Sequence, residues 1–237
     1  MKLLLLSNAK REGMAYLEHA TGYFRDFFGG SVREILFVPF AGVTKTPDKY
    51  VEQVRPVFES IGIKVTGIHS TQDPVTAVRK AQAVLVGGGS TWKLLRELRL
   101  QGLLPEIRNR ALAGMPYAGW SAGSNIACPT IMTTNDMPIC DPGGFDALAL
   151  VPFQINPHYL HGNPPGFKGE TREERIAEYG VLNPRQWVAG LREGTAFVVE
   201  DGSIRLVGEA QCRIFRHGEA PRELDPGADF RFLLAPG

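Results

Sequence analysis

Short apolar segments separated by helical patterns fill the first half of the chain. The apolar segments are continuous rather than alternating, which is typical of strands covered on both faces of a parallel sheet. Between them, apolar residues recur with the 3.6-residue period of amphipathic helices. This alternation predicts a parallel sheet with helices on both faces, joined by right-handed crossovers. The expected strands span residues 2–7, 34–40, 64–69, 83–86 and 115–119.

Capping signals mark the beginning of two of the expected helices. Thr46 precedes Pro47, and Asp73 precedes Pro74, so each pair offers an N-cap side chain followed by proline at the first helical position. Pro56 lies within the apolar stripe of the helix that begins at Pro47, and it predicts a kink or an early end there. Other helical patterns cover residues 14–28, 92–98 and 104–112.

The second half of the chain has a different pattern. Two long polar segments, 130–144 and 156–170, contain proline and glycine and are expected to be functional loops. A capping box at 171–174 predicts a short helix, and Asp201-Gly202 predicts the turn of a β-hairpin. The expected architecture is one domain over residues 1–237, with a mostly parallel sheet and an antiparallel C-terminal extension. Further strands are expected at 148–155, 187–191, 212–215 and 230–234.

Composition and charge exclude several classes of protein. The chain has 237 residues, of which 43% are hydrophobic and 22% charged, as in ordinary globular proteins. A net charge of +1 gives no global attraction to nucleic acid or to anionic lipid. The apolar runs are too short for a membrane span or a signal peptide. Cys128, Cys140 and Cys212 are not in C-x-x-C spacing, so we expect reduced thiols in a cytoplasmic protein.

A candidate nucleophile lies at the end of the fifth expected strand. Gly119-Trp120-Ser121-Ala122-Gly123 is a G-x-S-x-G pentapeptide, followed by small residues that open a helix. A serine on such a sharp turn exposes its hydroxyl, the two glycines relieve crowding, and the Ala122 N–H faces the position of an oxyanion. The sequence therefore predicts Ser121 as a nucleophile. The alternative is a turn serine whose hydroxyl caps the following helix.

A cluster of three glycines follows the fourth expected strand. Gly87-Gly88-Gly89-Ser90 opens the next helix, but it lacks the lysine of a P-loop and the spaced glycines of a dinucleotide fingerprint. The carboxyl ends of parallel strands share one edge of a sheet, where ligands bind. Gly88 or Gly89 is therefore expected to supply the second oxyanion donor, the alternative being a plain tight turn.

A serine nucleophile needs an adjacent base, and the chain has five histidines. We favour His158, because it directly follows an expected strand and a turn fixed by proline. The spacing of His158 and His161 also fits two metal ligands, but no third ligand is evident, so neither a metal nor another cofactor is expected. Asp136 and Glu193 are the candidates for the carboxylate that orients the imidazole, and Asp136 is slightly favoured.

Seven segments of the chain are distinctive, and they are 4–8 (LLLSN), 39–44 (PFAGVT), 86–89 (VGGG), 119–123 (GWSAG), 133–138 (TTNDMP), 154–158 (QINPH) and 168–173 (KGETRE). Together, and in the same order over residues 1 to about 200, they resemble the peptidase E family of α-aspartyl dipeptidases, serine peptidases related to the cyanophycinases. The resemblance implies a flavodoxin-like three-layer α/β sandwich, related in architecture to class I glutamine amidotransferases. It also implies metal-free cleavage of dipeptides with an N-terminal aspartate (Asp-Xaa).

The resemblance places the family's catalytic residues on this chain. Its nucleophile, histidine and aspartate fall on Ser121, His158 and Asp136. The glutamate once considered as a third member falls on Glu193. The implied reaction proceeds through an acyl-enzyme on the serine.

The resemblance also implies how substrate is held. Arg172 falls where the family's arginine is expected to meet the substrate aspartate. Ser90 stands where the family's glycine loop usually continues with asparagine, and serine can still cap the helix and bond a ligand. The expected partner is a small dipeptide, with no nucleic acid and no membrane, and the expected state is a monomer or a homodimer.

Two other functions fit parts of the sequence. An α/β-hydrolase esterase would use Ser121 with His217 and either Asp201 or Asp225, an order that the chain permits. The short spacing from Ser121 to His158 and the early glycine loop count against it. A non-catalytic amino-acid or peptide sensor on the same scaffold is the other alternative.

Overall fold

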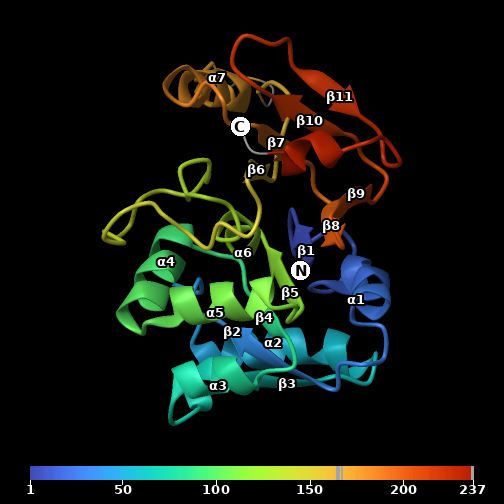
Figure 1. The fold of residues 1–237 in the computed structure, drawn as a ribbon, viewed down its shortest axis with the longest axis vertical. Coiled ribbons are helices and arrows are strands. Elements are labelled where there is room, and N and C mark those ends of the chain that lie inside the picture. Colours follow the sequence, from blue (N-terminus) through green and yellow to red (C-terminus); the bar gives the residue numbers. More distant parts are fainter. Residues whose placement is uncertain (164–165, 167, 236–237) are drawn as a thin grey trace.

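The leucines of the first strand, β1 (Lys2–Leu6), point alternately into two separate hydrophobic cores. Leu3 and Leu5 belong to one core, Leu4 and Leu6 to the other, and all four are buried. A strand that is apolar on both faces must be covered on both. The computed structural model, which describes residues 1–163, 166 and 168–235, accordingly has a three-layer α/β arrangement as its main part (Figure 1).

The central layer is a seven-stranded sheet in the order β3-β2-β4-β5-β1-β8-β9. The first five strands along the chain are mutually parallel, and the hairpin of β8 and β9 extends the sheet antiparallel from β1. This confirms the expected mostly parallel sheet with an antiparallel extension. Beyond β1 its strands are β2 (Glu34–Val38), β3 (Lys64–Gly67), β4 (Val84–Val86), β5 (Tyr117–Trp120), β8 (Ala196–Glu200) and β9 (Ser203–Val207).

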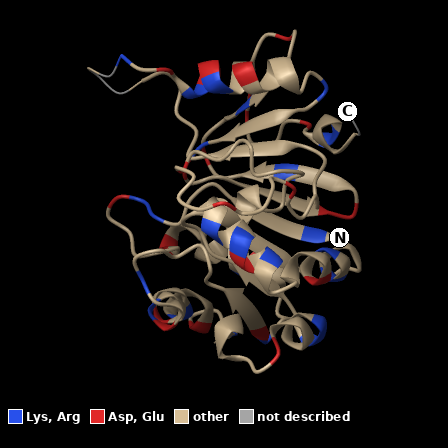
Figure 2. Ribbon diagram, turned by 90° about the vertical axis from the view of Figure 1, so that its left-hand side faces the viewer, with Lys and Arg blue, Asp and Glu red and all other residues tan. Residues whose placement is uncertain are grey.

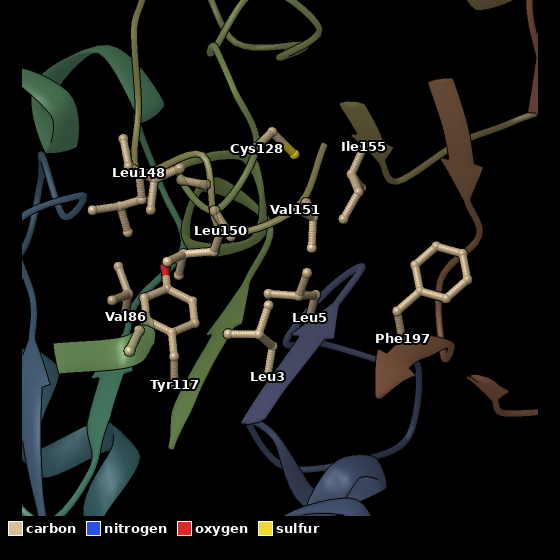
Figure 3. Close-up of a cluster of buried hydrophobic side chains, with 14 of the residues drawn as sticks. Leu3, Leu5, Val86, Tyr117, Cys128, Leu148, Leu150, Val151, Ile155 and Phe197 are labelled. Carbon is tan, nitrogen blue, oxygen red and sulfur yellow. The ribbon is translucent and has the colours of Figure 1, made fainter. Parts of the chain in front are cut away.

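Helices cover both faces of this sheet. The face with Leu4 packs against α1 (Thr21–Phe28) and α2 (Pro47–Glu59). The other face packs against four helices, and in Figure 3 Leu3, Leu5 and Val86 of the sheet lie among side chains of the segment 148–155. Those helices are α3 (Pro74–Lys80), α4 (Thr91–Leu100), α5 (Leu103–Leu112) and α6 (Ala122–Asn125).

A second sheet, which the sequence did not predict, lies at the top of Figure 1. It has four strands in the order β11-β10-β7-β6, and β6 and β7 are parallel to each other. The helix α7 (Arg172–Leu182) packs on it through Ile176, which contacts Val188 and Phe215. The strands are β6 (Gln154–Pro157), β7 (Val188–Leu191), β10 (Cys212–Phe215) and β11 (Arg222–Leu224).

The predicted helix beginnings are confirmed. The Thr46 side chain accepts from Lys49 N–H, Asp73 accepts from Val75 and Thr76 N–H, and the capping box at Thr171 is complete. The hairpin turn is confirmed as well, with positive φ at both Asp201 and Gly202.

Four local predictions are wrong in whole or in part. Of the strand expected at 148–155, only the last two residues lie in β6, because the N–H groups of Leu148 and Leu150 donate to the carbonyls of Ile126 and Ala127 and not to a neighbouring strand. The segment 230–234 is a 3-10 turn, η3 (Arg231–Leu234), because Phe230 and Leu233, three residues apart, are both buried on one side of it. The first helix begins only at Thr21, after the 3-10 turn η1 (Glu18–Ala20), because Leu17 has a left-handed φ of 63°. The early end expected at Pro56 does not occur, because α2 continues to Glu59 and proline in the last turn disrupts little of the helix.

Charge is distributed without a single dominant sign. Figure 2 shows basic and acidic residues interspersed along the helices, in keeping with the net charge of +1. Within residues 1–163, 166 and 168–235, no helix combines the length and apolarity that crossing a membrane requires.

Candidate active site

Three loops that carry candidate chemistry emerge at one edge of the large sheet. Leu6 pairs with Trp120, and Val86 pairs with Gly119, so β1, β4 and β5 end side by side. The residues that follow these ends are Ser7, the glycine loop 87–89 and Ser121. The edge is the one where parallel sheets bind ligands.

Ser121 lies on a strained turn between β5 and α6. Its backbone has φ 51° and ψ −110°, a conformation that L-residues rarely adopt. A Cβ on Gly119 would lie 2.6 Å from the Gly123 carbonyl, and a Cβ on Gly123 would lie 2.2 Å from the Val86 carbonyl oxygen. Both glycines of the pentapeptide are therefore required by close backbone packing, as the sequence predicted.

The hydroxyl of Ser121 faces an imidazole. Its Oγ lies 3.0 Å from Nε2 of His158. Ser121 precedes the first residue of α6, yet its side chain makes no capping hydrogen bond. The alternative of a mere helix cap is therefore wrong.

His158 is held from its backbone as well as from its ring. It directly follows β6, and its φ of 53° is again in the left-handed region. Its N–H donates to Oγ of Ser7 at 2.9 Å, and the Ser7 hydroxyl donates to the Leu191 carbonyl at 2.8 Å. Ser7, fully buried at the end of β1, thus connects the large sheet to the small one. Sequence reasoning missed Ser7, although a small polar residue ending a buried strand beside β5 was a usable signal.

Glu193 is the carboxylate that contacts the imidazole. Its Oε1 lies 2.6 Å from Nδ1 of His158. The contact follows from strand pairing, because Pro157 of β6 and Leu191 of β7 are parallel neighbours. The loop after Glu193 is fixed by Asn8, whose Oδ1 accepts the Gly194 N–H at 2.8 Å. A carboxylate at Nδ1 retains the proton there and leaves Nε2 free to accept one from Ser121.

Asp136, favoured from sequence as the orienting carboxylate, makes other contacts. Its Oδ2 accepts the Thr91 N–H at 2.8 Å, and its Oδ1 accepts the Thr134 hydroxyl. The free N–H groups and positive dipole end of α4 attract this carboxylate. Among the hydrogen bonds of the described part of the chain, none joins Asp136 to His158, so the predicted contact is wrong and Glu193 takes its place.

The glycine loop passes directly beside Ser121. A Cβ on Gly88 would lie 3.1 Å from the Ser121 Cβ, and Gly89 has φ 138°. On either side the loop is anchored, because Gly87 N–H donates to Val38 and Ser90 N–H donates to Ala41. Within the described residues, the N–H groups of Gly88, Gly89 and Ala122 have no protein acceptor, so all three are available to an oxyanion.

Comparison with known proteins decides the family. The profile of Peptidase family S51 matches residues 3–207. The chain belongs to peptidase family S51. It is therefore a serine-type peptidase, a hydrolase, which sets aside the non-catalytic sensor.

Full-length relatives agree with this assignment. Peptidase E of Nostoc sp. is 48% identical over 233 residues, covering 98% of this chain and 96% of the relative. Peptidase E of Salmonella typhimurium is 49% identical over 230 residues, covering 97% and 100%.

Solved structures support the same fold. A protein of Listeria monocytogenes EGD-e, named provisionally as a peptidase E, superposes with a TM-score of 0.65 at 25% identity, covering 88% of this chain and 98% of that one. A peptidase from an acI-B1 Actinobacterium superposes with a TM-score of 0.72 at 17% identity, covering 97% and 96%.

Arg172 of this S51 peptidase lines a cavity beside the histidine loop. The cavity measures about 390 Å³ and includes Asn135 and Asn156 in its wall. Arg172 is the first residue of α7, and its buried Nη1 has no hydrogen-bond partner in the described part of the chain. Burial lowers the pKa of its guanidinium, which indicates a cation without full solvation. Such a group is suited to bind a carboxylate.

Ser90 caps α4, as expected from sequence. Its side chain accepts the Lys93 N–H at 3.2 Å, and the residue is buried at 8% exposure. Nothing in the described contacts places it against a ligand, so its predicted substrate contact stays a prediction.

Two other histidines of this S51 peptidase, His161 and His217, lie away from Ser121. His161 Nδ1 lies 2.8 Å from Glu173, and no group of three or more potential metal ligands occurs within the described residues. His217 lines a groove between α7 and β10, while Asp201 forms the β8–β9 turn. Asp225 accepts from Gln211 at 2.9 Å. The esterase triad is therefore not assembled.

Proposed function

We propose that this S51 peptidase hydrolyses dipeptides with an N-terminal aspartate through Ser121, His158 and Glu193. The observation that carries the proposal is the chain of contacts from Oγ to Nε2 at 3.0 Å and from Nδ1 to the carboxylate at 2.6 Å. Relatives named peptidase E, matched over nearly the whole chain, support it.

The first half of the reaction forms an acyl-enzyme. Ser121 Oγ attacks the scissile carbonyl carbon while His158 Nε2 takes its proton. The Ala122 N–H and a glycine-loop N–H stabilise the negative charge that develops on the carbonyl oxygen. The resulting imidazolium is stabilised by Glu193. His158 then protonates the leaving amine, and the C–N bond breaks.

The second half repeats these roles with water. His158 takes a proton from a water molecule, whose oxygen attacks the ester carbonyl of the acyl-enzyme. The tetrahedral intermediate collapses, Ser121 regains its proton, and aspartate leaves. No metal has a role in these steps.

Arg172 gives the proposed site its preference for aspartate. A guanidinium presents two parallel N–H donors, which match both oxygens of the substrate β-carboxylate. Its position at the N-terminal end of α7 adds the positive end of a helix dipole. A substrate with an apolar first residue would leave the buried Nη1 of this half-buried cation without a partner, which disfavours its binding.

The decisive experiment measures hydrolysis of Asp-Xaa, Glu-Xaa, Ala-Xaa and ester substrates by wild type and by Ser121→Ala. The wild type should cleave Asp-Xaa preferentially and retain its activity with chelator present. Ser121→Ala should abolish turnover, while His217→Ala, at the distant groove, should leave it unchanged. Substantial activity in Ser121→Ala, or equal rates on Asp-Xaa and Ala-Xaa, would refute the proposal.

We also infer a cytoplasmic location and a monomeric or homodimeric state. The cysteines support the location, since Cys128, Cys140 and Cys212 are all free thiols. Burial raises the pKa of Cys128 to about 12, so this thiol stays protonated and unreactive. Light scattering on the purified protein tests the state, and a mass above that of a dimer would contradict it.

A further inference from the structure

A chain of aromatic side chains lies behind the glycine loop and takes no part in the mechanism above. The Tyr50 hydroxyl donates to the Gly88 carbonyl at 2.8 Å. Tyr16 Oη lies 2.9 Å from Tyr50 Oη, and Trp120 Nε1 donates to Tyr16 at 3.0 Å and to Tyr50 at 3.3 Å. Tyr50 and Trp120 are each only 1% exposed, and Trp120 immediately precedes Ser121.

The direction of every hydrogen bond in this chain is fixed by chemistry. An indole N–H can only donate, and a carbonyl oxygen can only accept. The Tyr50 proton is committed to Gly88, so Tyr16 must donate to Tyr50 while it accepts from Trp120. All donors therefore point toward the glycine loop, and bonds in such a chain polarise one another.

The Gly88 carbonyl, which accepts the hydrogen bond from Tyr50, belongs to the same peptide unit as the Gly89 N–H. No peptide bond in the described residues is cis, so this C=O and this N–H point in opposite directions. Tyr50 approaches from α2, on one face of the sheet, and holds the carbonyl on that side. The Gly89 N–H consequently faces away from α2 and has no protein acceptor within the described contacts.

We propose that Tyr50 is a positioning residue of the oxyanion hole: its hydroxyl holds the Gly88–Gly89 peptide so that the Gly89 N–H faces the oxyanion formed on Ser121. The proposal rests on the proposed function, because an oxyanion forms only when Ser121 attacks a carbonyl. The sequence left open whether Gly88 or Gly89 supplies the second N–H donor to the oxyanion, and the proposal favours Gly89.

A peptide between two glycines needs such an anchor. Glycine rotates easily through conformations closed to other residues, so this unit is able to flip and present its carbonyl to the site instead. The loop is built for close approach by Tyr50, since a Cβ on Gly87 would lie 2.8 Å from the Tyr50 Oη. The Tyr50 ring is itself fixed, with Lys45 Nζ 4.3 Å from its centroid and Phe37 packed edge-on at 5.1 Å.

Tyr50→Phe tests the proposal, because it removes the hydroxyl and retains the packed ring. Loss of one oxyanion donor lowers kcat by about 10²–10³ in other hydrolases. Since this variant misorients the donor rather than deleting it, kcat per titrated active site should fall about 10- to 30-fold, with KM within twofold. Binding of an aspartyl aldehyde, which forms a tetrahedral adduct with serine, should weaken by the same factor, whereas binding of the product aspartate should not change.

Tyr16→Phe is the matched control. It removes a neighbouring hydroxyl of the same cluster but leaves the bond from Tyr50 to Gly88. Tyr16→Phe should lower kcat less than Tyr50→Phe does, by about threefold or less, because it only weakens the polarisation of the hydrogen bond from Tyr50 to Gly88. An equal loss in both variants would overturn the specific role of Tyr50.

Further outcomes separate this inference from the proposed function. An inactive wild type refutes the proposed function. The inference about Tyr50 is then tested by NMR, because the amide resonance of Gly89 must differ between the wild type and Tyr50→Phe. A Tyr50→Phe protein with kcat within twofold of wild type overturns the inference, as does equal weakening of aldehyde and aspartate. If the variant does not fold, the wild-type Gly89 amide proton must move on formation of the aldehyde adduct, and an unchanged resonance overturns the inference.

Discussion

Replacing Glu193 by glutamine removes the charge that faces His158 while keeping the shape of the side chain. The structure places that charge 2.6 Å from Nδ1. A glutamine amide offers N–H donors as well as one oxygen, so the imidazole can be held with its proton on Nε2. In that tautomer Nε2 is unable to accept the Ser121 proton. The imidazolium of the proposed mechanism also loses its stabilising partner.

The size of the effect depends on solvent exposure. Unit charges about 4 Å apart attract by about 1 kcal/mol in water and about 4 kcal/mol at an effective dielectric constant near 20. The side chains of His158 and Glu193 are 37% and 52% exposed, which places the pair between these limits. We take about 2.7 kcal/mol, which corresponds to a loss of about 100-fold in kcat. A fully buried orienting carboxylate is worth up to about 10⁴-fold.

The assay compares kcat for an Asp-Xaa dipeptide in Glu193→Gln and Asp136→Asn. Asparagine retains an oxygen that accepts the Thr91 N–H, so Asp136→Asn should lower kcat less than about tenfold. Unfolding temperature and active-site titration show that both proteins are intact. The reasoning is refuted if kcat falls more in Asp136→Asn than in Glu193→Gln, or if Glu193→Gln retains the kcat of the wild type.

Three other substitutions test neighbouring parts of the structure. Arg172→Lys should lower kcat/KM for Asp-Xaa by about tenfold or more while sparing Ala-Xaa, because a point charge replaces a two-pronged donor; a uniform loss across the substrate panel would contradict this. Ser7→Ala removes the acceptor of the His158 N–H, and should lower kcat together with Tm, the latter by about 2–8 °C for about 1–2 kcal/mol lost; an unchanged Tm and kcat would show that the link between the sheets is dispensable. The hydrogen bond from Arg192 lowers the pKa of Glu223 below its usual 4.5, so this ion pair contributes fully to stability above that value and its contribution is lost as pH falls through the lower folded pKa. Glu223→Gln should therefore show a smaller drop in Tm than wild type between pH 7 and about pH 3, and parallel curves in differential scanning fluorimetry would count against the assignment.

Much of the large sheet was predictable because its signals are local. Continuous apolar segments marked the five parallel strands, and residues close in sequence marked the caps at Thr46 and Asp73. The β8–β9 turn was equally clear, since Asp201-Gly202 matches the positive φ at both positions. The segment 230–234 misled because a short apolar run does not distinguish a strand from a single turn of helix.

In the candidate site, too, the residues marked by local sequence patterns were predicted, and those fixed by long-range contacts were not. Ser121 and His158, whose side chains lie 3.0 Å apart, were predicted from a local pentapeptide and from a strand end. The carboxylate that contacts His158 is Glu193 and not Asp136, and this depends on the parallel pairing of β6 with β7. That pairing belongs to a second sheet, which no local sequence pattern predicted. Ser7 was missed because its acceptor, Leu191, lies 184 residues further along the chain. The role we propose for Tyr50 likewise depends on a partner 38 residues away.

The proposed path of proton transfer runs between the two sheets of the fold. Ser121 follows β5 of the large sheet, whereas His158 and Glu193 follow β6 and β7 of the small sheet. Misplacement by about 1 Å is enough to cost about 10²-fold in rate. A small shift of one sheet against the other would thus reduce the proposed activity while the secondary structure stays intact, so the rate of turnover would report their alignment more sensitively than any measure of overall secondary structure.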